Sequence, residues 1–590
     1  MSDIGAINLQ WSATLIQALV DGGITHFVIS PGSRSTPLAL AVARHPDTKY
    51  WVIVDERDAA FMALGQSKKR EVPTALICTS GTAVANWLPA VIEAYHSSTP
   101  LLLLSADRPP ELHNCGANQT IAQNNIFGEQ VSARYTTPPP DEIDDPVTQL
   151  TELVPQMIES MENPAPGPVH LNIPFREPLL ARNSKQIKWH NSGLQYAARD
   201  HADNTIPVID YQEICQEVSG KPGVILCGES HYPKGFNTVL NQLAESLGAP
   251  VFADPLSNLR WGDDDNQLFF THYDGILRNE KNRRLCRPEW VIQFGRFPLS
   301  KAVATLLQES LPKRYITVHH KTVWSDPLSL SNTKISTSPA TFCQQLLQYA
   351  DPNPTDNLPA SPCGCPSGRP QPQAGNSHLH TLKEKERLAA EWRSNPDDLS
   401  EDQVIRTLNR QLPGGTILFS GNSMVIRDID GWMTQREEPL KLFANRGASG
   451  IDGNLATVCG IRAVTDPDTP VVALLGDLTL FHNLNALYLA KELEMDLTII
   501  VINNGGGNIF SHLPPAQLPE FESLWLTPTT VEFKRVAALY DIPYREVTDR
   551  DGLALYLDEV LQQPHPKLIE LTIDRNISNR NHHQYWESLH

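Results

Sequence analysis

The sequence contains no apolar run of the length that a membrane-spanning helix needs, and its first residues lack the basic segment and apolar core of a signal peptide. Its nine cysteines are odd in number and scattered, a pattern that favours reduced thiols over a disulfide framework. Basic residues are in the minority, since 48 Lys and Arg against 67 Asp and Glu give a net charge of −19. We therefore expect a cytoplasmic protein with no membrane insertion and no extended nucleic-acid surface.

A dinucleotide fingerprint is also missing from the middle of the chain. After the apolar run at 223–227, the segment GESHYPKG offers only Gly228 and Gly235 in place of a G-x-G-x-x-G motif. A flavin or nicotinamide cofactor is therefore not expected in this part of the protein.

Short apolar runs alternate with amphipathic stretches along the whole chain, which predicts an α/β fold with buried parallel strands. Strands are expected at 27–30, 51–54, 75–79, 101–105 and 169–173, then at 223–227, 250–253, 290–294 and 315–318, and finally at 416–420, 471–476, 497–503 and 567–572. These groups predict three consecutive doubly wound parallel-sheet domains, at 1–185, 190–350 (central) and 379–590. The segment 351–378 is rich in Pro, Gly and Ser and is interpreted as a linker.

Two polar dipeptides follow consecutive predicted strands of the C-terminal domain. Gly476-Asp477 ends the first of these strands, and Asn503-Asn504 ends the second. A carboxylate and an amide oxygen are suitable ligands for Mg²⁺, and the glycines that follow let backbone groups approach the ion and a diphosphate. Each dipeptide alone is more often a helix cap or a turn, but together their spacing fits one βαβ crossover. The pair therefore predicts a metal–diphosphate site at the carboxyl ends of the strands.

This pair resembles the signature of thiamine-diphosphate enzymes, in which Gly-Asp is followed by Asn-Asn. Leu478 departs from that pattern, because many relatives have a second glycine there. The resemblance implies a further carboxylate beside the pyrimidine ring of the cofactor, supplied by the N-terminal domain of a partner subunit. Glu56 fits this role because it follows a strand expected to be buried and starts a helix. By itself Glu56 is more simply explained as a first-turn helix acid, and only together with the metal–diphosphate pair does it become the catalytic candidate; Asp55 is the alternative.

Five longer segments narrow the resemblance: HFVISPGSRSTPLALA, SADRPPELHNCGANQTI, GNSMVIRDID, ANRGASGIDG and NNGGGNIFSHLP. They are similar to segments of the 2-succinyl-5-enolpyruvyl-6-hydroxy-3-cyclohexene-1-carboxylate synthase family of menaquinone biosynthesis. The resemblance implies thiamine diphosphate with Mg²⁺ (or Mn²⁺), decarboxylation of 2-oxoglutarate, and 1,4-addition of the succinyl carbanion equivalent to isochorismate. It also implies a homodimer or homotetramer with its active sites at the subunit interface.

The same resemblance assigns roles to individual residues. The catalytic residues it implies are Glu56 and Gln119. The cofactor is expected to contact Glu56, Pro31, Gly32, Ser423, Ile451, Gly476, Leu478, Asn504 and Ile509, and the metal to bind Asp477, Asn504 and the carbonyl of Gly506. Isochorismate is expected at Ser33, Arg34, Arg108, Asn118, Gln119 and Lys301, the oxoglutarate-derived part at Ser423, Arg427 and Arg446, and an apolar wall at Ile509, Phe510 and Leu513.

The chemistry of the substrates agrees with the four arginines, because both substrates are dicarboxylates and the guanidinium group binds carboxylates with two parallel hydrogen bonds. An isolated arginine is usually a solvated surface residue, and the three apolar side chains could equally belong to an ordinary core. Lys301 is followed by Ala302, where some relatives carry a second basic residue.

Two other functions stay open at this point. Another thiamine-dependent 2-oxoacid decarboxylase or carboligase would share the metal–diphosphate site and Glu56 but would not need so many arginines. A non-catalytic nucleotide-binding or regulatory protein could retain the fold without the chemistry. The joint presence of Glu56, Asp477 and Asn504 argues against this second alternative.

Overall fold

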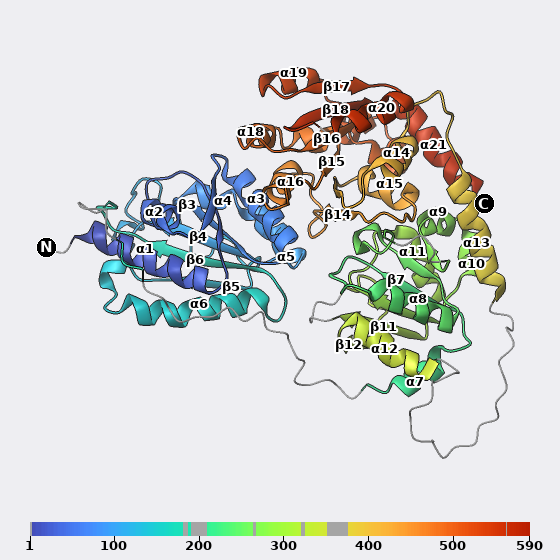
Figure 1. Ribbon diagram of the computed structural model, residues 1–590, viewed down its shortest axis with the longest axis horizontal. Coiled ribbons are helices and arrows are strands. Elements are labelled where there is room, and N and C mark those ends of the chain that lie inside the picture. Colours follow the sequence, from blue (N-terminus) through green and yellow to red (C-terminus); the bar gives the residue numbers. More distant parts are fainter. Residues whose placement is uncertain are drawn as a thin grey trace, which may run out of the picture.

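The computed structural model describes residues 3–180, 187–189, 209–262, 267–319, 325–350, 376–561 and 563–589. Figure 1 shows an N-terminal domain (blue to cyan) on one side, with the central (green) and C-terminal (orange to red) domains on the other. Each domain contains one six-stranded sheet whose strand pairs are all parallel. The predicted α/β fold with three parallel-sheet domains is therefore confirmed.

The strands are β1 (His26–Ile29), β2 (Lys49–Val52), β3 (Thr74–Cys78), β4 (Leu101–Asp107), β5 (Ala133–Thr136) and β6 (Pro168–Pro174) in the first sheet; β7 (Gly223–Cys227), β8 (Val251–Ala253), β9 (Phe269–Phe270), β10 (Trp290–Phe294), β11 (Arg314–His319) and β12 (Thr333–Ser336) in the second; and β13 (Ile417–Ser420), β14 (Lys441–Ala444), β15 (Val471–Gly476), β16 (Thr498–Asn503), β17 (Tyr544–Val547) and β18 (Lys567–Thr572) in the third.

The helices are α1 (Ile4–Asp21), α2 (Thr36–Arg44), α3 (Glu56–Arg70), α4 (Thr82–Ala85), α5 (Leu88–His96) and α6 (Pro146–Glu162) in the N-terminal domain; α7 (Tyr211–Val218), α8 (Phe236–Leu247), α9 (Tyr273–Arg278), α10 (Glu280–Leu285), α11 (Lys301–Ser310) and α12 (Pro339–Ala350) in the central domain; and α13 (Asn376–Glu391), α14 (Glu401–Gln411), α15 (Met424–Trp432), α16 (Asn454–Ala463), α17 (Asp477–Phe481), α18 (Asn485–Glu492), α19 (Phe533–Leu539), α20 (Arg550–Val560) and α21 (Arg575–Ser588) in the C-terminal domain.

The bounds between the domains stay predictions. Most of the predicted linker lies outside the described residues, and α13 already begins at Asn376, so the predicted linker end at 378 falls inside a helix. The physical reason is the sequence that follows Asn376, which is rich in Leu, Lys, Glu and Ala and therefore favours helix.

The first and third sheets share one strand order. It runs β2-β1-β3-β4-β6-β5 in the first sheet and β14-β13-β15-β16-β18-β17 in the third, so β1, β3 and β4 occupy the places of β13, β15 and β16. The central sheet has a different order, β12-β11-β10-β7-β8-β9. In sheets of this kind ligands bind beyond the carboxyl ends of the strands where the strand order reverses. The N- and C-terminal domains therefore present equivalent candidate edges.

Strand β2 differs from the prediction. The sequence suggested a buried strand before Glu56, but β2 is the edge strand of its sheet, and Tyr50, Val52 and Val54 are 46%, 54% and 75% exposed. The apolar composition of this segment was the reason for expecting burial. In a single chain nothing covers that edge among the described residues, so the apolar side chains face solvent.

Helices α3 and α16 join the N- and C-terminal domains, as their adjacent ribbons in Figure 1 show. One hydrophobic core includes Phe61 and Leu64 of α3 together with Leu455 and Val458 of α16. This packing places the first turn of α3, with Glu56, against the C-terminal domain of the same chain.

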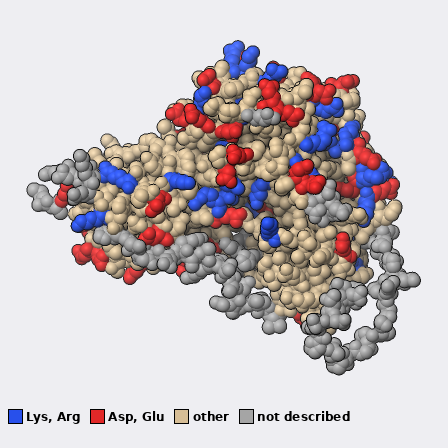
Figure 2. Space-filling view, in the orientation of Figure 1, with Lys and Arg blue, Asp and Glu red and all other residues tan. Residues whose placement is uncertain are grey.

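Figure 2 shows acidic and basic side chains interspersed on the face of the molecule in view. Of the helices that the structure describes, none combines the length and the apolar character needed to span a membrane.

Candidate functional site

A cavity of about 170 Å³ lies at the carboxyl ends of β13, β15 and β16 in the C-terminal domain. The structure brings together at this cavity most of the residues that the sequence assigned to the cofactor and the metal, namely Ser423, Ile451, Gly476, Asp477, Leu478, Asn504, Gly506 and Ile509. Phe510, a predicted part of the apolar wall, lines it as well. These residues come from four separate segments, and the parallel sheet places their strand ends at one edge.

Asp477 sits at the bottom of this cavity and is only 2% exposed. It begins α17 directly after β15, and its two carboxylate oxygens accept hydrogen bonds of 2.7 Å from the backbone N–H groups of Leu478 and Gly506. Burial raises the pKa of this carboxyl to about 6. A divalent cation beside the carboxylate would favour its charged form and act against that shift.

Gly506 shows why a glycine is needed next to Asp477. Its backbone has a φ of +124°, which side-chain-bearing residues rarely adopt, and a Cβ at this position would lie 2.3 Å from the carbonyl oxygen of Leu526. The loop after β16 can therefore approach Asp477 closely only with a glycine at this position.

The two asparagines at the end of β16 point in different directions. Asn503 donates from its side-chain nitrogen to Glu570 (2.6 Å), whereas Asn504 lines the cavity and donates to Glu401 (3.3 Å). Because the amide nitrogen of Asn504 is used in this way, its amide oxygen is the atom that could bind a cation. Asn503 supports the loop by accepting from the N–H of Gly505 (3.3 Å).

The donor set of this cavity fits a magnesium–diphosphate group. A buried carboxylate, an amide oxygen and a glycine-rich loop are the oxygen ligands and close backbone approach that Mg²⁺ and a diphosphate require. No group of three or more His, Cys, Asp or Glu side chains forms a metal site elsewhere within the described residues. The predicted ligands, one carboxylate, one amide and a backbone carbonyl, line this cavity and stay a prediction.

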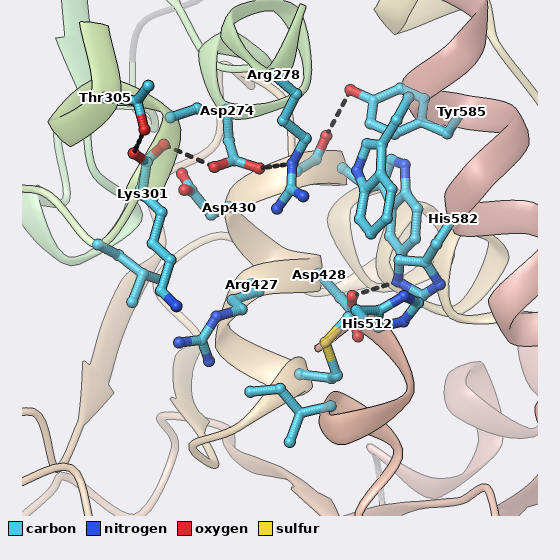
Figure 3. Close-up of a pocket in the computed structure, with 18 of the residues that line it drawn as sticks. Asp274, Arg278, Lys301, Thr305, Arg427, Asp428, Asp430, His512, His582 and Tyr585 are labelled. Atoms are coloured by element: carbon cyan, nitrogen blue, oxygen red, sulfur yellow. Dashed lines mark hydrogen bonds and ion pairs between the residues drawn. The ribbon is translucent and has the colours of Figure 1, made fainter. Parts of the chain in front are cut away.

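A second cavity of about 320 Å³ adjoins the first, because Met424, Asp428 and Ile509 line both. Figure 3 shows it between α9 and α11 of the central domain and α15 and α21 of the C-terminal domain. Three further residues that the sequence assigned to substrate line this cavity: Lys301, Arg427 and Leu513.

Most charged groups in the second cavity are already paired. Arg278 binds Asp274 at 2.8 Å, and Arg283 binds Glu309 at 2.9 Å. Of the basic residues that line this cavity in the described structure, Lys301 and Arg427 have no carboxylate within ion-pair distance. Burial, followed by the nearby charge of Arg446, lowers the pKa of Arg427, which is what a buried cation without an anionic partner experiences. These two cations are therefore suited to bind an anionic ligand.

The His582–Asp428 pair was missed by the sequence analysis. His582 on α21 lies 2.9 Å from Asp428 on α15, and both side chains are buried (Figure 3). Although burial alone would lower it, the hydrogen bond and charge of Asp428 raise the pKa of His582 to about 9, and burial raises that of Asp428 to about 6. Asp428 thus pairs with His582, while its charge also favours the charged form of the adjacent Arg427. No local sequence signal could have joined two residues 154 positions apart.

Arg446 lies beside the second cavity without lining it. Its guanidinium donates to the side-chain oxygen of Asn422 at 3.0 Å, and the residue lines another pocket with Asp254 and Arg296 of the central domain. Since Asn422 lines the first cavity, Arg446 is connected to it through that hydrogen bond. Burial lowers the pKa of Arg446.

A second group of predicted residues gathers in the N-terminal domain, beyond the ends of β1, β3 and β4. The side chain of Arg108 donates to Ser80 and lies 3.5 Å from Gln119, which in turn donates to the carbonyl of Ser80 at 3.0 Å. Burial and the nearby charge of Arg34 lower the pKa of Arg108, so the two arginines lie within electrostatic range. The remaining predicted residues of this edge are Pro31, Gly32, Ser33 and Asn118.

Arg34 is largely engaged within its own domain. It is 5% exposed, and it donates to the carbonyl of Phe175 at 2.9 Å and to Glu177 at 2.8 Å. Its Nε atom is buried without a hydrogen-bond partner in the described structure, so one donor of the guanidinium stays unused.

Glu56 is the first residue of α3, as predicted, and is partly buried. Asp55, the alternative candidate, accepts hydrogen bonds from the N–H groups of Arg57 and Asp58 and so caps this helix. The described residues that line the first cavity all belong to the C-terminal domain, so Glu56 does not reach it within one chain.

The predicted site is therefore divided into two halves in a single chain. One half, at β13, β15 and β16, holds the candidate metal and diphosphate ligands, and the other, beyond β1, β3 and β4 and at the start of α3, holds Glu56, Gln119 and two arginines. The halves occupy equivalent edges of two sheets with the same strand order.

Comparison with known protein families agrees with this division. The N-terminal thiamine pyrophosphate-binding domain of thiamine pyrophosphate enzymes matches residues 10–129, and the C-terminal thiamine pyrophosphate-binding domain matches 429–571. The middle domain of thiamine pyrophosphate enzymes matches residues 183–420. The N-terminal match contains Glu56, Arg108 and Gln119, and the C-terminal match contains Asp477 and Asn504, whereas Ser423 and Arg427 lie just before it.

Relatives with similar sequences extend over almost the whole chain. Three of them are proteins of Dechloromonas aromatica (38% identical over 97% of this chain and 99% of the relative), Oceanobacillus iheyensis (35%, 98% and 97%) and Geobacillus kaustophilus (34%, 98% and 97%). Each is a 2-succinyl-5-enolpyruvyl-6-hydroxy-3-cyclohexene-1-carboxylate synthase. The chain belongs to the 2-succinyl-5-enolpyruvyl-6-hydroxy-3-cyclohexene-1-carboxylate synthase family of thiamine pyrophosphate enzymes.

Proposed function

We propose that two copies of this chain together form each active site and that the predicted residues carry out the reaction of the family there. The activity is that of a thiamine-diphosphate-dependent transferase of menaquinone biosynthesis, which forms 2-succinyl-5-enolpyruvyl-6-hydroxy-3-cyclohexene-1-carboxylate and CO₂ from 2-oxoglutarate and isochorismate. The residue roles rest on one observation. The first cavity, with the candidate metal ligands, adjoins the second cavity, with Lys301 and Arg427, and the two share Met424, Asp428 and Ile509.

In this proposal Asp477, Asn504 and the carbonyl of Gly506 would hold Mg²⁺ or Mn²⁺ together with the diphosphate. Gly476, Leu478, Ser423, Ile451 and Ile509 line the same cavity and would contact the cofactor. When bound, the cofactor supplies the carbon nucleophile for decarboxylation and addition, so no nucleophilic side chain is needed. Pro31 and Gly32 would contact the cofactor from the other half of the site.

Glu56 and Gln119 of the partner copy would be the catalytic residues of the site. The carboxylate of Glu56 would share a proton with a ring nitrogen of the bound pyrimidine. Gln119 would orient reacting groups or guide a proton, since an amide is not a strong base.

The substrate carboxylates would bind the cationic side chains. Arg427, Arg446 and Ser423 would hold the oxoglutarate-derived part, and Lys301 would reach isochorismate from the central domain. Ser33, Arg34, Arg108 and Asn118 would hold isochorismate from the N-terminal domain, and Ile509, Phe510 and Leu513 would pack against its ring. The free cationic character of Lys301 and Arg427 in the second cavity supports this assignment.

A second copy of the chain is the partner that the exposed apolar surface favours. Tyr50, Val52 and Val54 of the β2 segment precede Glu56, and Phe481 and Tyr488 follow Asp477, with exposed fractions between 46% and 75%. Apolar side chains beside both halves of the site would be buried if the N-terminal half of one chain met the C-terminal half of another. We infer a homodimer, or a homotetramer built from such dimers.

Complementation between two inactive variants tests the shared site. Glu56→Gln chains and Asp477→Asn chains should each be inactive, but their coexpression should restore about a quarter of the wild-type activity, because half of the dimers are mixed and one of their two sites carries both intact residues. Activity of the coexpressed mixture is compared with that of each variant alone. A mixture as inactive as its components would contradict a site built from two chains.

A substrate comparison tests the reaction itself. With thiamine diphosphate, Mg²⁺ and isochorismate present, 2-oxoglutarate should be consumed with product formation and pyruvate should not, because pyruvate lacks the second carboxylate that the cationic cavity binds. Product is followed by the loss of isochorismate absorbance and by mass spectrometry. Equal turnover of pyruvate would favour the alternative, another thiamine-dependent decarboxylase or carboligase.

We also propose that the protein acts in the cytoplasm and that its domains have the bounds 1–185, 190–350 and 379–590. The free, largely buried thiols, such as Cys78, Cys227 and Cys459, support a reducing compartment.

A further inference from the structure

The loop between β14 and α16 carries two residues of the proposed site, Arg446 and Ile451. Its own domain holds this loop on one side. Asn422 donates from its side-chain nitrogen to the carbonyl of Asn445 at 2.8 Å and to that of Gly450 at 2.6 Å. Both ends of the segment around Arg446 are therefore fixed to the end of β13.

The N-terminal domain holds the same loop on the other side, through Glu93 of α5. One carboxylate oxygen of Glu93 accepts from the backbone N–H of Gly447 at 2.8 Å, and the other accepts from the N–H of Ala448 at 2.7 Å. Glu93 is 3% exposed, and the ammonium group of Lys68, also buried, lies 3.5 Å from it. Two short hydrogen bonds to a buried carboxylate are strong and directional.

The loop backbone lies directly against the end of α5. A Cβ at Gly447 would lie 2.5 Å from the carbonyl oxygen of Glu93 and 2.6 Å from the nitrogen of Ser97. This close contact explains why the residue after Arg446 is a glycine. It also means that the position of Arg446 is defined relative to the N-terminal domain and not to its own sheet alone.

We propose that Glu93 is a positioning residue that fixes Arg446 for binding of 2-oxoglutarate, so that the N-terminal domain shapes the site of its own chain while it supplies Glu56 to its partner's. This inference rests on the proposed role of Arg446. The role of Glu93 follows from the geometry, because this one side chain of the N-terminal domain fixes two backbone N–H groups next to Arg446. Without the carboxylate, both N–H groups would lie buried and unpaired, and the loop would have to move to satisfy them.

Glu93→Gln is the variant that tests the proposal, because the amide has nearly the same shape but can accept from only one of the two N–H groups. Hydrogen exchange of peptides covering 445–452 should become faster in this variant. KM for 2-oxoglutarate should rise about tenfold while kcat changes by less than about threefold, because a misplaced binding residue weakens substrate and transition state alike. Exchange reports on the loop without depending on activity or bound cofactor.

Asp58→Asn is the matched control. Asp58 is a buried acid of α3 that bonds Asn483 of the C-terminal domain at 2.7 Å, at the same boundary between domains but away from the Arg446 loop. Its replacement should leave both the exchange of 445–452 and KM for 2-oxoglutarate unchanged. If Glu93→Gln does not fold, Glu93→Asp replaces it, since the shorter acid keeps the charge but cannot reach both N–H groups.

Each outcome decides the proposal. Unchanged exchange at 445–452 in the Glu93 variant would overturn it. Faster exchange with unchanged KM would also overturn it. An Arg446→Ala variant then shows whether the role of Glu93 or the role of Arg446 is wrong. A raised KM in Arg446→Ala leaves the proposed function intact and removes only the role of Glu93, whereas an unchanged KM in Arg446→Ala removes the proposed role of Arg446 itself.

Discussion

Replacing Glu56 by Gln should lower kcat by about a thousandfold, the size of effect that a positioned proton-handling group contributes. Glutamine has nearly the shape of glutamate, but its amide cannot share a proton with the pyrimidine nitrogen of the cofactor. The fold should tolerate the change, because Asp55 and not Glu56 caps α3, and because Glu56 is only partly buried. The melting temperature should stay within about 2 °C of the wild-type value, since substitutions away from buried networks change stability little.

Steady-state kinetics with 2-oxoglutarate and isochorismate, at saturating thiamine diphosphate and Mg²⁺, measures this effect. Glu71→Gln is the control, because it removes an acid at the other end of the same helix, where Glu71 pairs with the exposed His231. Its kcat should stay within about twofold of the wild type, as is usual for exposed ion pairs. An active Glu56→Gln enzyme would show that another group handles the proton.

Replacing Asp477 by Asn should weaken metal-dependent binding of thiamine diphosphate by about a hundredfold, because the only carboxylate among the proposed ligands is lost. The substitution also disturbs this site, since the two oxygens of Asp477 accept from the N–H groups of Leu478 and Gly506 and the amide keeps only one of them. Activity at ordinary cofactor concentrations should be lost with the affinity.

Calorimetric titration of thiamine diphosphate at fixed Mg²⁺ measures the affinity of the Asp477→Asn variant. Treating the wild type with a chelator should produce the same loss, and adding Mg²⁺ or Mn²⁺ should reverse it. Asp496→Asn is the control: Asp496 lies at the other end of β16, where it pairs with Lys567 at 2.8 Å. Cofactor affinity that does not depend on a divalent ion, or that survives in Asp477→Asn, would remove the metal role of Asp477.

Much of this protein could be predicted from local sequence. Asp477 and Asn504 each follow an uninterrupted apolar run, and such runs form adjacent parallel strands whose ends meet at one edge. Their arrangement at one cavity, and the α/β architecture itself, follow from that rule. Glu56 likewise lies at the start of a helix, as predicted, and the structure shows that Asp55 caps that helix.

Features that depend on distant contacts could not be predicted in this way. The family resemblance selected Asn504 over Asn503 as a ligand, but local sequence gives no reason for the choice; the pleat of the strand sends Asn503 to Glu570 and Asn504 to the cavity. The apolar β2 segment looked buried, because composition does not say whether a strand lies at the edge of its sheet. The ion pair between His582 and Asp428 also joins residues with no local relationship.

The sequence by itself determined the fold class and the family and predicted the metal–diphosphate ligands, because these depend on short motifs and on periodic burial. Only the tertiary structure decided which predicted residues line one cavity, that His582 pairs with Asp428 beside Arg427, and that Glu93 reaches across a domain boundary to the Arg446 loop. The physical reason is that charge balance and loop position depend on side chains brought together by packing, which sequence spacing does not encode.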